Sequence, residues 1–256
     1  MTTAPQIGAT TRFFPALQAV YAGTLARARV ARAPLLFVAS LQSIGLIVLM
    51  RGIVSEDAQA EHAQLVAGAT ILVVAFVALN LLAQRIGALK ARGALDYYAA
   101  LPVPSTAVVL GLTAGYATFT LPGTAITAAV GVLLYNLPAL HIWVLVPAVV
   151  LGGAALAGIG AVIGLLAPRP ELATVAGQLA MSAVLFLDLV LASRLPAALR
   201  VVRAVLPSTY AADALAAALI EPADLGLVMR QLAIAAAIAL ASLAAAGWAW
   251  RRAMRP

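Results

Sequence analysis

The sequence contains no cysteine, a single lysine and few charged or aromatic residues. Charged side chains make up 10% of the 256 residues and aromatic ones 6%, whereas 64% are hydrophobic. Without cysteine, disulfide bonds, thiolate nucleophiles and cysteine-held zinc are excluded. A soluble protein of this length needs far more charged surface. The mean hydropathy of +1.05 therefore predicts an integral membrane protein.

Common catalytic motifs are also missing. The sequence has no H-E-x-x-H and no G-x-S-x-G, and Lys90 is flanked by Leu89 and Ala91, which excludes the phosphate loop G-x-x-x-x-G-K-[ST]. His62 and His141 lie at predicted span ends and share no metal-ligand spacing with a carboxylate. We expect no catalytic site, no metal and no cofactor in this chain.

Six segments are long and apolar enough to cross a bilayer, which takes about 20 helical residues. The first thirty residues lack a positive start followed by an apolar run, so we expect no cleavable signal peptide. The fold class is an all-α integral membrane protein with six transmembrane helices. The expected spans are 33–50, 63–84, about 105–134, 142–167, 172–192 and 231–250.

Basic residues indicate the orientation of these spans. With six crossings, eleven Lys and Arg residues fall on the side of the termini and five on the other side. Basic loops stay in the cytoplasm, so both termini are expected inside, in a plasma (inner) membrane protein. The same rule explains the net charge of +7 without nucleic-acid binding.

Two segments outside the spans have a helical character of their own. Residues 1–32 are expected to form a cytoplasmic tail and an interfacial amphipathic helix, followed by a six-span domain over 33–256. Phe14, Leu17, Tyr21 and Leu25 would share one face of that helix. Residues 195–230 form neither a short loop nor a full crossing. Prolines divide them into short apolar helices that would dip into the outer leaflet or pack on the bundle as a hairpin.

Small residues and one acid stand out within the spans. Gly111 and Gly115 form a G-x-x-x-G, and Gly153 begins a small-residue stripe in the fourth span, which predicts close helix packing within the chain. Asp188 is the one acid clearly inside a span, near its outer end. It is a candidate substrate or ion contact, or a side chain that reaches the interface or pairs with Arg194.

Residues 86–104 are expected to form a cytoplasmic coupling loop, in which a charged, helix-like stretch covers residues 91–101. Leu95, Tyr98 and Leu101 would share one face of a short helix, which Pro102 and Pro104 end. An exposed leucine and two exposed tyrosines beside water favour a covering partner protein, although tyrosines also suit lipid headgroups.

Two motifs carry a resemblance to a known family. Arg92-Gly93-Ala94-Leu95 with Leu101-Pro102-Val103 is similar to the cytoplasmic segment before the third span in permeases of ABC-2 type exporters, although Ala94 replaces the usual hydroxyl residue. The stretch 206–219, "LPSTYAADALAAAL", resembles that family's Asn-Pro-x-Thr-Tyr-x-x-x-Ala-Leu segment, with Leu206 in place of the asparagine.

The resemblance implies a permease dimer without an ATPase site, which binds separate ATPase subunits that hold ATP and Mg²⁺. A second copy or a paralogue would complete the dimer in the lipid bilayer. Tyr210 joins Asp188 as a possible substrate or outer-gate residue. The residues implied in coupling to the ATPase are Arg92, Gly93, Leu95, Asp96, Tyr97, Tyr98, Leu101 and Pro102.

The expected function is export of a lipophilic or amphipathic compound, such as a drug or natural product. Export of a polysaccharide or lipid is the alternative within the family, but sugar pathways use aromatic faces, which are scarce here. An ion-coupled secondary transporter would need more intramembrane carboxylates than Asp188 and inverted repeats. An intramembrane enzyme would need a catalytic constellation that is absent.

Overall fold

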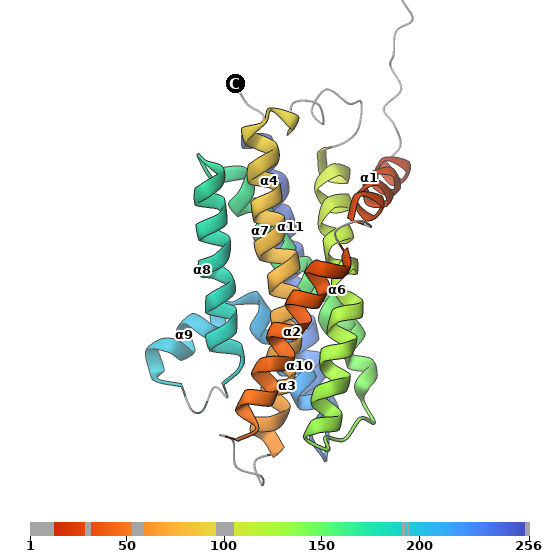
Figure 1. Ribbon diagram of the computed structural model, residues 1–256, viewed down its shortest axis with the longest axis vertical. Coiled ribbons are helices and arrows are strands. Elements are labelled where there is room, and N and C mark those ends of the chain that lie inside the picture. The colour runs from red at the N-terminus through yellow and green to blue at the C-terminus, as the bar shows by residue number, and fades with distance from the viewer. Residues whose placement is uncertain are drawn as a thin grey trace, which may run out of the picture.

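The computed structural model describes residues 13–28, 32–52, 59–95, 105–190, 193 and 195–253. Regular structure in these ranges is entirely helical, and the long helices run side by side in one bundle (Figure 1). The elements are α1 Phe13–Ala28, α2 Arg32–Met50, α3 Gln59–Val74, the π-helix η1 Ala75–Leu81, α4 Leu82–Ala91, α6 Ser105–Leu134, the 3-10 helix η2 Ile142–Val144, α7 Leu145–Leu166, α8 Pro170–Asp188, α9 Ala197–Val205, α10 Pro207–Ala218 and α11 Leu225–Ala253.

One continuous helix forms the centre of the bundle. It consists of α3, η1 and α4, and α2, α6, α7, α8 and α10 pack around it. Its sequence is apolar almost without interruption, so it can be surrounded on all sides without burying charge. Ile71, Leu72 and Leu79 are among its largest fully buried side chains.

The helices confirm most of the expected span boundaries. The third span is α6, which begins at Ser105, directly after Pro104, because proline ends one helix and permits the next to start. Five helices among the described residues are long and apolar enough to cross a membrane. The first expected span corresponds to α2, which has 19 residues, and its crossing stays a prediction.

Small residues hold the helices together within the chain, as the sequence predicts. A Cβ atom on Gly160 of α7 would lie 2.5 Å from the carbonyl oxygen of Leu79, and one on Gly131 of α6 would lie 2.6 Å from a Val66 methyl. Contacts this short leave no room for a side chain. At Gly160 the two backbones meet directly, and at Gly131 the helix backbone packs against a valine side chain, as in other closely packed membrane helices.

The N-terminal helix forms and packs against α6, with Leu17, Tyr21 and Leu25 half-buried. The phenyl ring of Phe14 is exposed, whereas Ala16 is buried. The small-residue motif of α6 receives this helix, since a Cβ on Gly111 would lie 2.8 Å from Val20 and one on Gly115 would lie 2.7 Å from Thr24. The face of α1 is thus set by where glycines open a groove on α6, and its interfacial position stays a prediction.

Two short helices divide the segment between α8 and α11, as expected. Pro196 precedes α9 and Pro207 begins α10. The two helices differ in placement. α10 is buried against the bundle, where its Ala211 meets Gly152 of α7, whereas α9 projects beside the end of α8 (Figure 1).

Candidate functional site

The end of α4 begins the segment that the sequence assigns to coupling. Arg92 follows the helix with its side chain exposed, and Gly93 has a φ of 67°. The Gly93 N–H donates to the Lys90 carbonyl at 3.0 Å. Glycine reaches this left-handed conformation without strain and therefore closes the helix. The chain turns here, so the predicted helix over 91–101 is not a continuation of α4.

Leu95 corrects the prediction of an exposed apolar coupling face. Its side chain is 2% exposed and belongs to the main apolar core. After the turn at Gly93 the chain folds back on the bundle, and burial of a leucine side chain is favourable. The other predicted coupling residues, Asp96, Tyr97, Tyr98, Leu101 and Pro102, lie outside the described residues.

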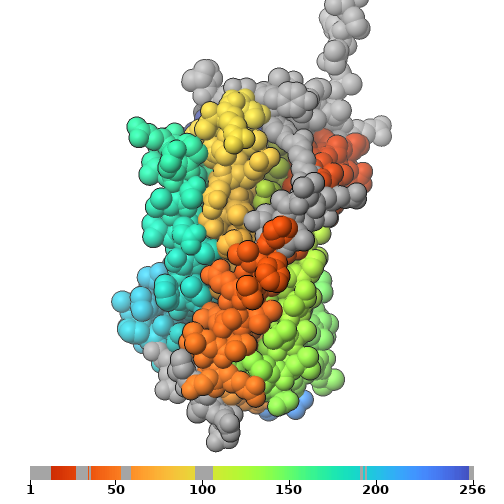
Figure 2. All heavy atoms as spheres, in the orientation of Figure 1, coloured from red at the N-terminus to blue at the C-terminus, as the bar shows by residue number. Residues whose placement is uncertain are grey.

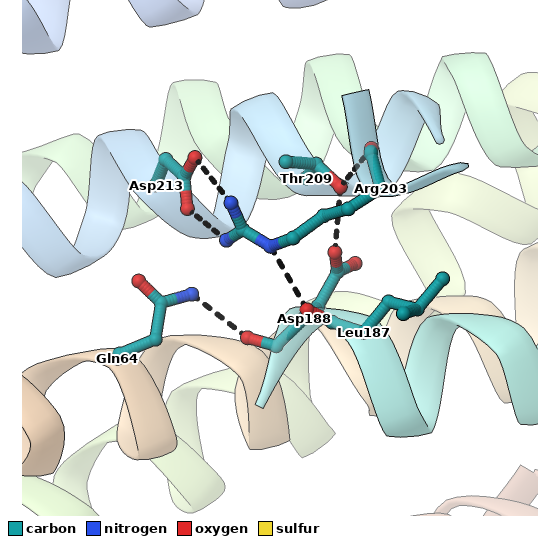
Figure 3. Close-up of polar contacts among 6 residues, drawn as sticks. All are labelled: Gln64, Leu187, Asp188, Arg203, Thr209 and Asp213. Carbon is teal, nitrogen blue, oxygen red and sulfur yellow. Dashed lines mark hydrogen bonds and ion pairs between the residues drawn. The ribbon is translucent and has the colours of Figure 1, made fainter. Parts of the chain in front are cut away.

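A buried polar cluster surrounds the predicted outer end of α8. Thr209 donates its hydroxyl to the Asp188 carboxylate, with 2.7 Å between Oγ1 and Oδ1 (Figure 3). The Gln64 side-chain amide donates to the Asp188 main-chain carbonyl at 2.8 Å. A Cβ on Gly68 would lie 2.5 Å from that same carbonyl oxygen. The end of α8 is thus held by α3 on one side and α10 on the other.

An arginine joins α9 to the same cluster. Arg203 is buried, donates from Nε to the Leu187 carbonyl at 2.8 Å, and forms a two-pronged ion pair with Asp213 of α10 (Figure 3). The planar guanidinium suits such a paired carboxylate. Among the described residues Asp188 forms no ion pair with this cation at 4 Å or less, although it lies in the same cluster. The Asp188 Oδ2 atom and the Ser208 hydroxyl are buried as well.

The two predicted outer-gate residues both act as ties between elements. Asp188 is fully enclosed, which is inconsistent with a side chain that reaches the interface. Its expected partner Arg194 lies outside the described residues. Tyr210 donates its hydroxyl to the Ala204 carbonyl at 2.8 Å and so joins α10 to α9. A role of either residue at a gate or in substrate binding stays a prediction.

Sequence reasoning did not find Arg203, Asp213 or the amide Gln64. The three residues come from separate elements, and Gln64 meets Asp188 across 124 positions. One signal was present: Arg203 lies in a short apolar helix whose other arginine, Arg200, is exposed. An arginine among apolar residues of a predicted membrane segment indicates a partner.

A second polar group lies halfway along α8. Asn80, buried in η1, donates its amide to Gln178 Oε1 at 3.2 Å and accepts from Gln84 Nε2 at 2.9 Å. Gln178 itself is exposed, as is Thr174 one turn earlier, and Ser182 one turn later is half-buried. Polar side chains spaced four residues apart share one helix face. The spacing could have been found in the sequence.

This polar stripe, Thr174, Gln178 and Ser182, lies on the least covered long helix. In Figure 2, α8 stands at the edge of the molecule beside α4. Next to the stripe α8 exposes apolar side chains, among them Val175 and Leu179. The hydroxyls of Thr174 and Ser182 donate to main-chain carbonyls one turn earlier, at 3.1 and 2.9 Å, so the amide of Gln178 is the most polar group of this face. An amide is costly in hydrocarbon, and a face that carries one is normally turned to a partner or to water.

Metal chemistry finds no support in the described residues. No group of three or more His, Asp or Glu side chains is placed to hold an ion within these ranges. His62 stacks on Tyr135 with 4.3 Å between ring centroids, and the Tyr135 hydroxyl donates to the Ile47 carbonyl. These contacts join the ends of α3, α6 and α2.

The long apolar helices, with polar groups placed between them and on α8, define a multi-span helical membrane protein. A family model described as ABC-2 type transporter matches residues 16–220. The chain belongs to this family, as the two sequence motifs predict, and it is an ABC-type permease, the membrane component of a transporter. Permeases of this family generally act together with ABC ATPase subunits. None of the curated proteins matches the chain.

Proposed function

We propose that this chain is the permease subunit of an ATP-driven exporter, powered by separate ATPase subunits. Those subunits bind at the end of the bundle where α4 ends and α7 turns into α8. This end and both termini face the cytoplasm, and the protein lies in the plasma (inner) membrane. ATP and Mg²⁺ are held by the partner. The exposed polar stripe of α8 is the observation that supports a transport pathway.

The proposed pathway runs along α8 and is completed by a second copy or a paralogue. Gln178 would expose its side-chain amide to lipid tails in a single chain, which costs free energy, whereas the Thr174 hydroxyl donates to the Pro170 carbonyl. A second permease facing this stripe removes that cost and encloses a passage. In a single chain, side chains of the neighbouring helices pack around the central helix, so no passage runs along it.

The proposed cargo is lipophilic or amphipathic, a drug or a natural product. Val175, Leu179 and Phe186 lie exposed on α8 beside the polar stripe, so the wall offers apolar surface with a few hydrogen-bonding groups. That mixture is typical of sites for small amphipathic ligands. Phe186 is the one aromatic residue in the α8 sequence, which has no Trp or Tyr, so the wall offers little of the aromatic surface that suits sugars.

Single cysteines test this proposal, because the chain has none of its own. Thr174→Cys and the adjacent Val175→Cys are made in the assembled complex with its ATPase and treated with a membrane-impermeant maleimide. Both side chains are exposed in the single chain, so exposure does not distinguish them. They differ only in the direction in which they leave the helix. Gln59→Cys and Ala91→Cys, both exposed, mark the expected outer and inner ends.

We expect Thr174→Cys to be labelled, with loss of substrate-stimulated ATP hydrolysis, and Val175→Cys to be labelled several-fold less. Gln59→Cys should be labelled from outside in intact cells and Ala91→Cys only after the membrane is opened. Equal labelling at 174 and 175, or a permease that neither binds nor stimulates an ATPase, would contradict the proposed function.

A further inference from the structure

Lys90, the only lysine in the sequence, lies in α4 but caps the C-terminal end of α7. Lys90, in the last turn of α4, donates from Nζ to the Leu165 carbonyl at 2.8 Å and to the Ala167 carbonyl at 3.0 Å. These carbonyls lie at the C-terminal end of α7, where main-chain acceptors lack partners within the helix. A cation is favoured at this negative end of the helix dipole.

The last turns of α4 are also in direct contact with both neighbours of that helix end. A Cβ on Gly164 of α7 would lie 2.7 Å from the Ala83 carbonyl oxygen. A Cβ on Gly87 would lie 2.8 Å from the Cβ of Ala173, in the first turns of α8. The end of α4 is therefore enclosed between the close of α7 and the start of α8.

Lys90 lies at the junction of this enclosure with the ATPase-facing segment. Gly93 turns the chain three residues later, and Leu95 is then buried in the core. On the other side of the lysine, α7 passes into α8 within residues 167–169. Thr174, the first residue of the exposed polar stripe, follows one turn into α8.

We propose that Lys90 is a positioning residue that makes the end of α4 and the α7–α8 turn move as one body. A displacement of the segment after Arg92 by an ATPase is thereby carried into α8 and its polar stripe. This inference rests on the proposed function for the source of the displacement, whereas the connection itself is a property of this chain.

A purely topological role does not account for the geometry. A basic residue that only marks the cytoplasmic side would extend its ammonium group into water, and Arg85 and Arg92 on either side are exposed in this way. Lys90 instead directs its ammonium group onto two carbonyls of another helix.

The test compares Lys90→Met, which keeps the length of the stem but removes the donors, with Lys90→Arg, which keeps charge and donors. In the complex with its ATPase, we expect Lys90→Met to retain ATPase binding but to lose about fivefold in substrate transported per ATP, at the low end of typical couplings between sites. Lys90→Arg should stay within about twofold of the parent, since a guanidinium also caps helix ends.

A second measurement needs no ATPase. Spin labels on Ala91→Cys and Glu171→Cys, both exposed positions, report the distance between the end of α4 and the start of α8. Lys90→Met should broaden this distance distribution, and Lys90→Arg should leave it narrow. If Lys90→Met does not insert, Lys90→Gln, which has one amide donor group, is judged by the same criteria.

The outcomes separate the two proposals. An unchanged distance distribution together with an unchanged transport-to-ATP ratio in Lys90→Met overturns the role of Lys90. A parent permease that binds no ATPase overturns the proposed function instead, and the spin-label distances still decide whether Lys90 joins the two elements.

Discussion

The central helix and α8 lie side by side, yet they are held in different ways. Of the most apolar 18 residues in Gln59–Ala91, 89% are buried within the chain, against 28% in α8. The backbone of the central helix meets glycines of α7 directly, and its valine side chains pack against glycines of α6. α8 also approaches the central helix closely near its start, at Gly177 and at the Asp188 carbonyl, and hydrogen bonds join the two helices at the middle and the C-terminal end of α8.

The comparison indicates that the two helices have different roles in the bundle. Close packing of many small residues fixes the central helix in one position, because a densely packed interior resists small displacements. α8 is largely uncovered, and its hydrogen bonds can be exchanged at modest cost, since such bonds in membranes average under about 1 kcal/mol. α8 is thus suited to be the moving wall of the proposed pathway.

The largest effect is expected where the central packing is broken. Gly160→Val places a side chain against the Leu79 carbonyl and should lower the free energy of unfolding by about 3 kcal/mol, as overpacking does. Gly45→Val in α2 is the matched control, because nothing lies within 4 Å of a Cβ there, and should change it by less than about 0.5 kcal/mol. Unfolding by SDS in mixed micelles measures both; similar losses would show that the two sites are packed alike.

A smaller loss is expected when the attachment of α8 at its C-terminal end is removed. Arg203→Met leaves Asp213 and the Leu187 carbonyl without their donor. Removing one partner of a fully buried pair costs about 3–5 kcal/mol, and we expect about 2 kcal/mol because Asp213 is 24% exposed.

The double variant Arg203→Met with Asp213→Asn serves as the control for this loss. The neutral amide no longer needs a cation, so part of the stability should return. A double variant less stable than Arg203→Met alone, in the same SDS unfolding measurement, would contradict a simple ion pair.

The smallest effect is expected at the middle of α8. Asn80→Leu removes the hydrogen bonds to Gln178 and Gln84 and should lower the free energy of unfolding by about 1 kcal/mol, the scale of polar contacts between membrane helices. The transport rate should fall by more than the loss of stability explains, because Gln178 would lose its fixed orientation. A loss as large as that of Gly160→Val would mean that α8 is bound as firmly as the central helix.

Much of the fold could be read from the sequence because a bilayer imposes simple requirements. Main-chain polar groups must be satisfied within each segment, so apolar runs of about 20 residues become helices. The start of α6 at Ser105 and the break of the outer hairpin at Pro207 followed from the prolines, and the two family motifs placed the chain in its family.

The candidate sites were predictable in part. Asp188 was found because an acid inside a span is rare, but its partner Thr209 was considered only as part of a motif. Leu95 was expected on the surface, since its spacing with Tyr98 says nothing about a turn at Gly93. A stripe such as Thr174, Gln178 and Ser182 is visible as a pattern, yet its exposure depends on the helices around it.

The sequence by itself determined that the chain is a helical membrane permease, where its apolar helices lie along the chain, and which residues are too polar for lipid. Only the tertiary structure decided which helix is central, which is left uncovered, and which residues meet. Hydropathy acts on neighbouring residues, whereas contacts such as Gln64 with Asp188 or Lys90 with Ala167 join positions 124 and 77 residues apart. Such pairs depend on how whole helices pack, and no local pattern encodes that.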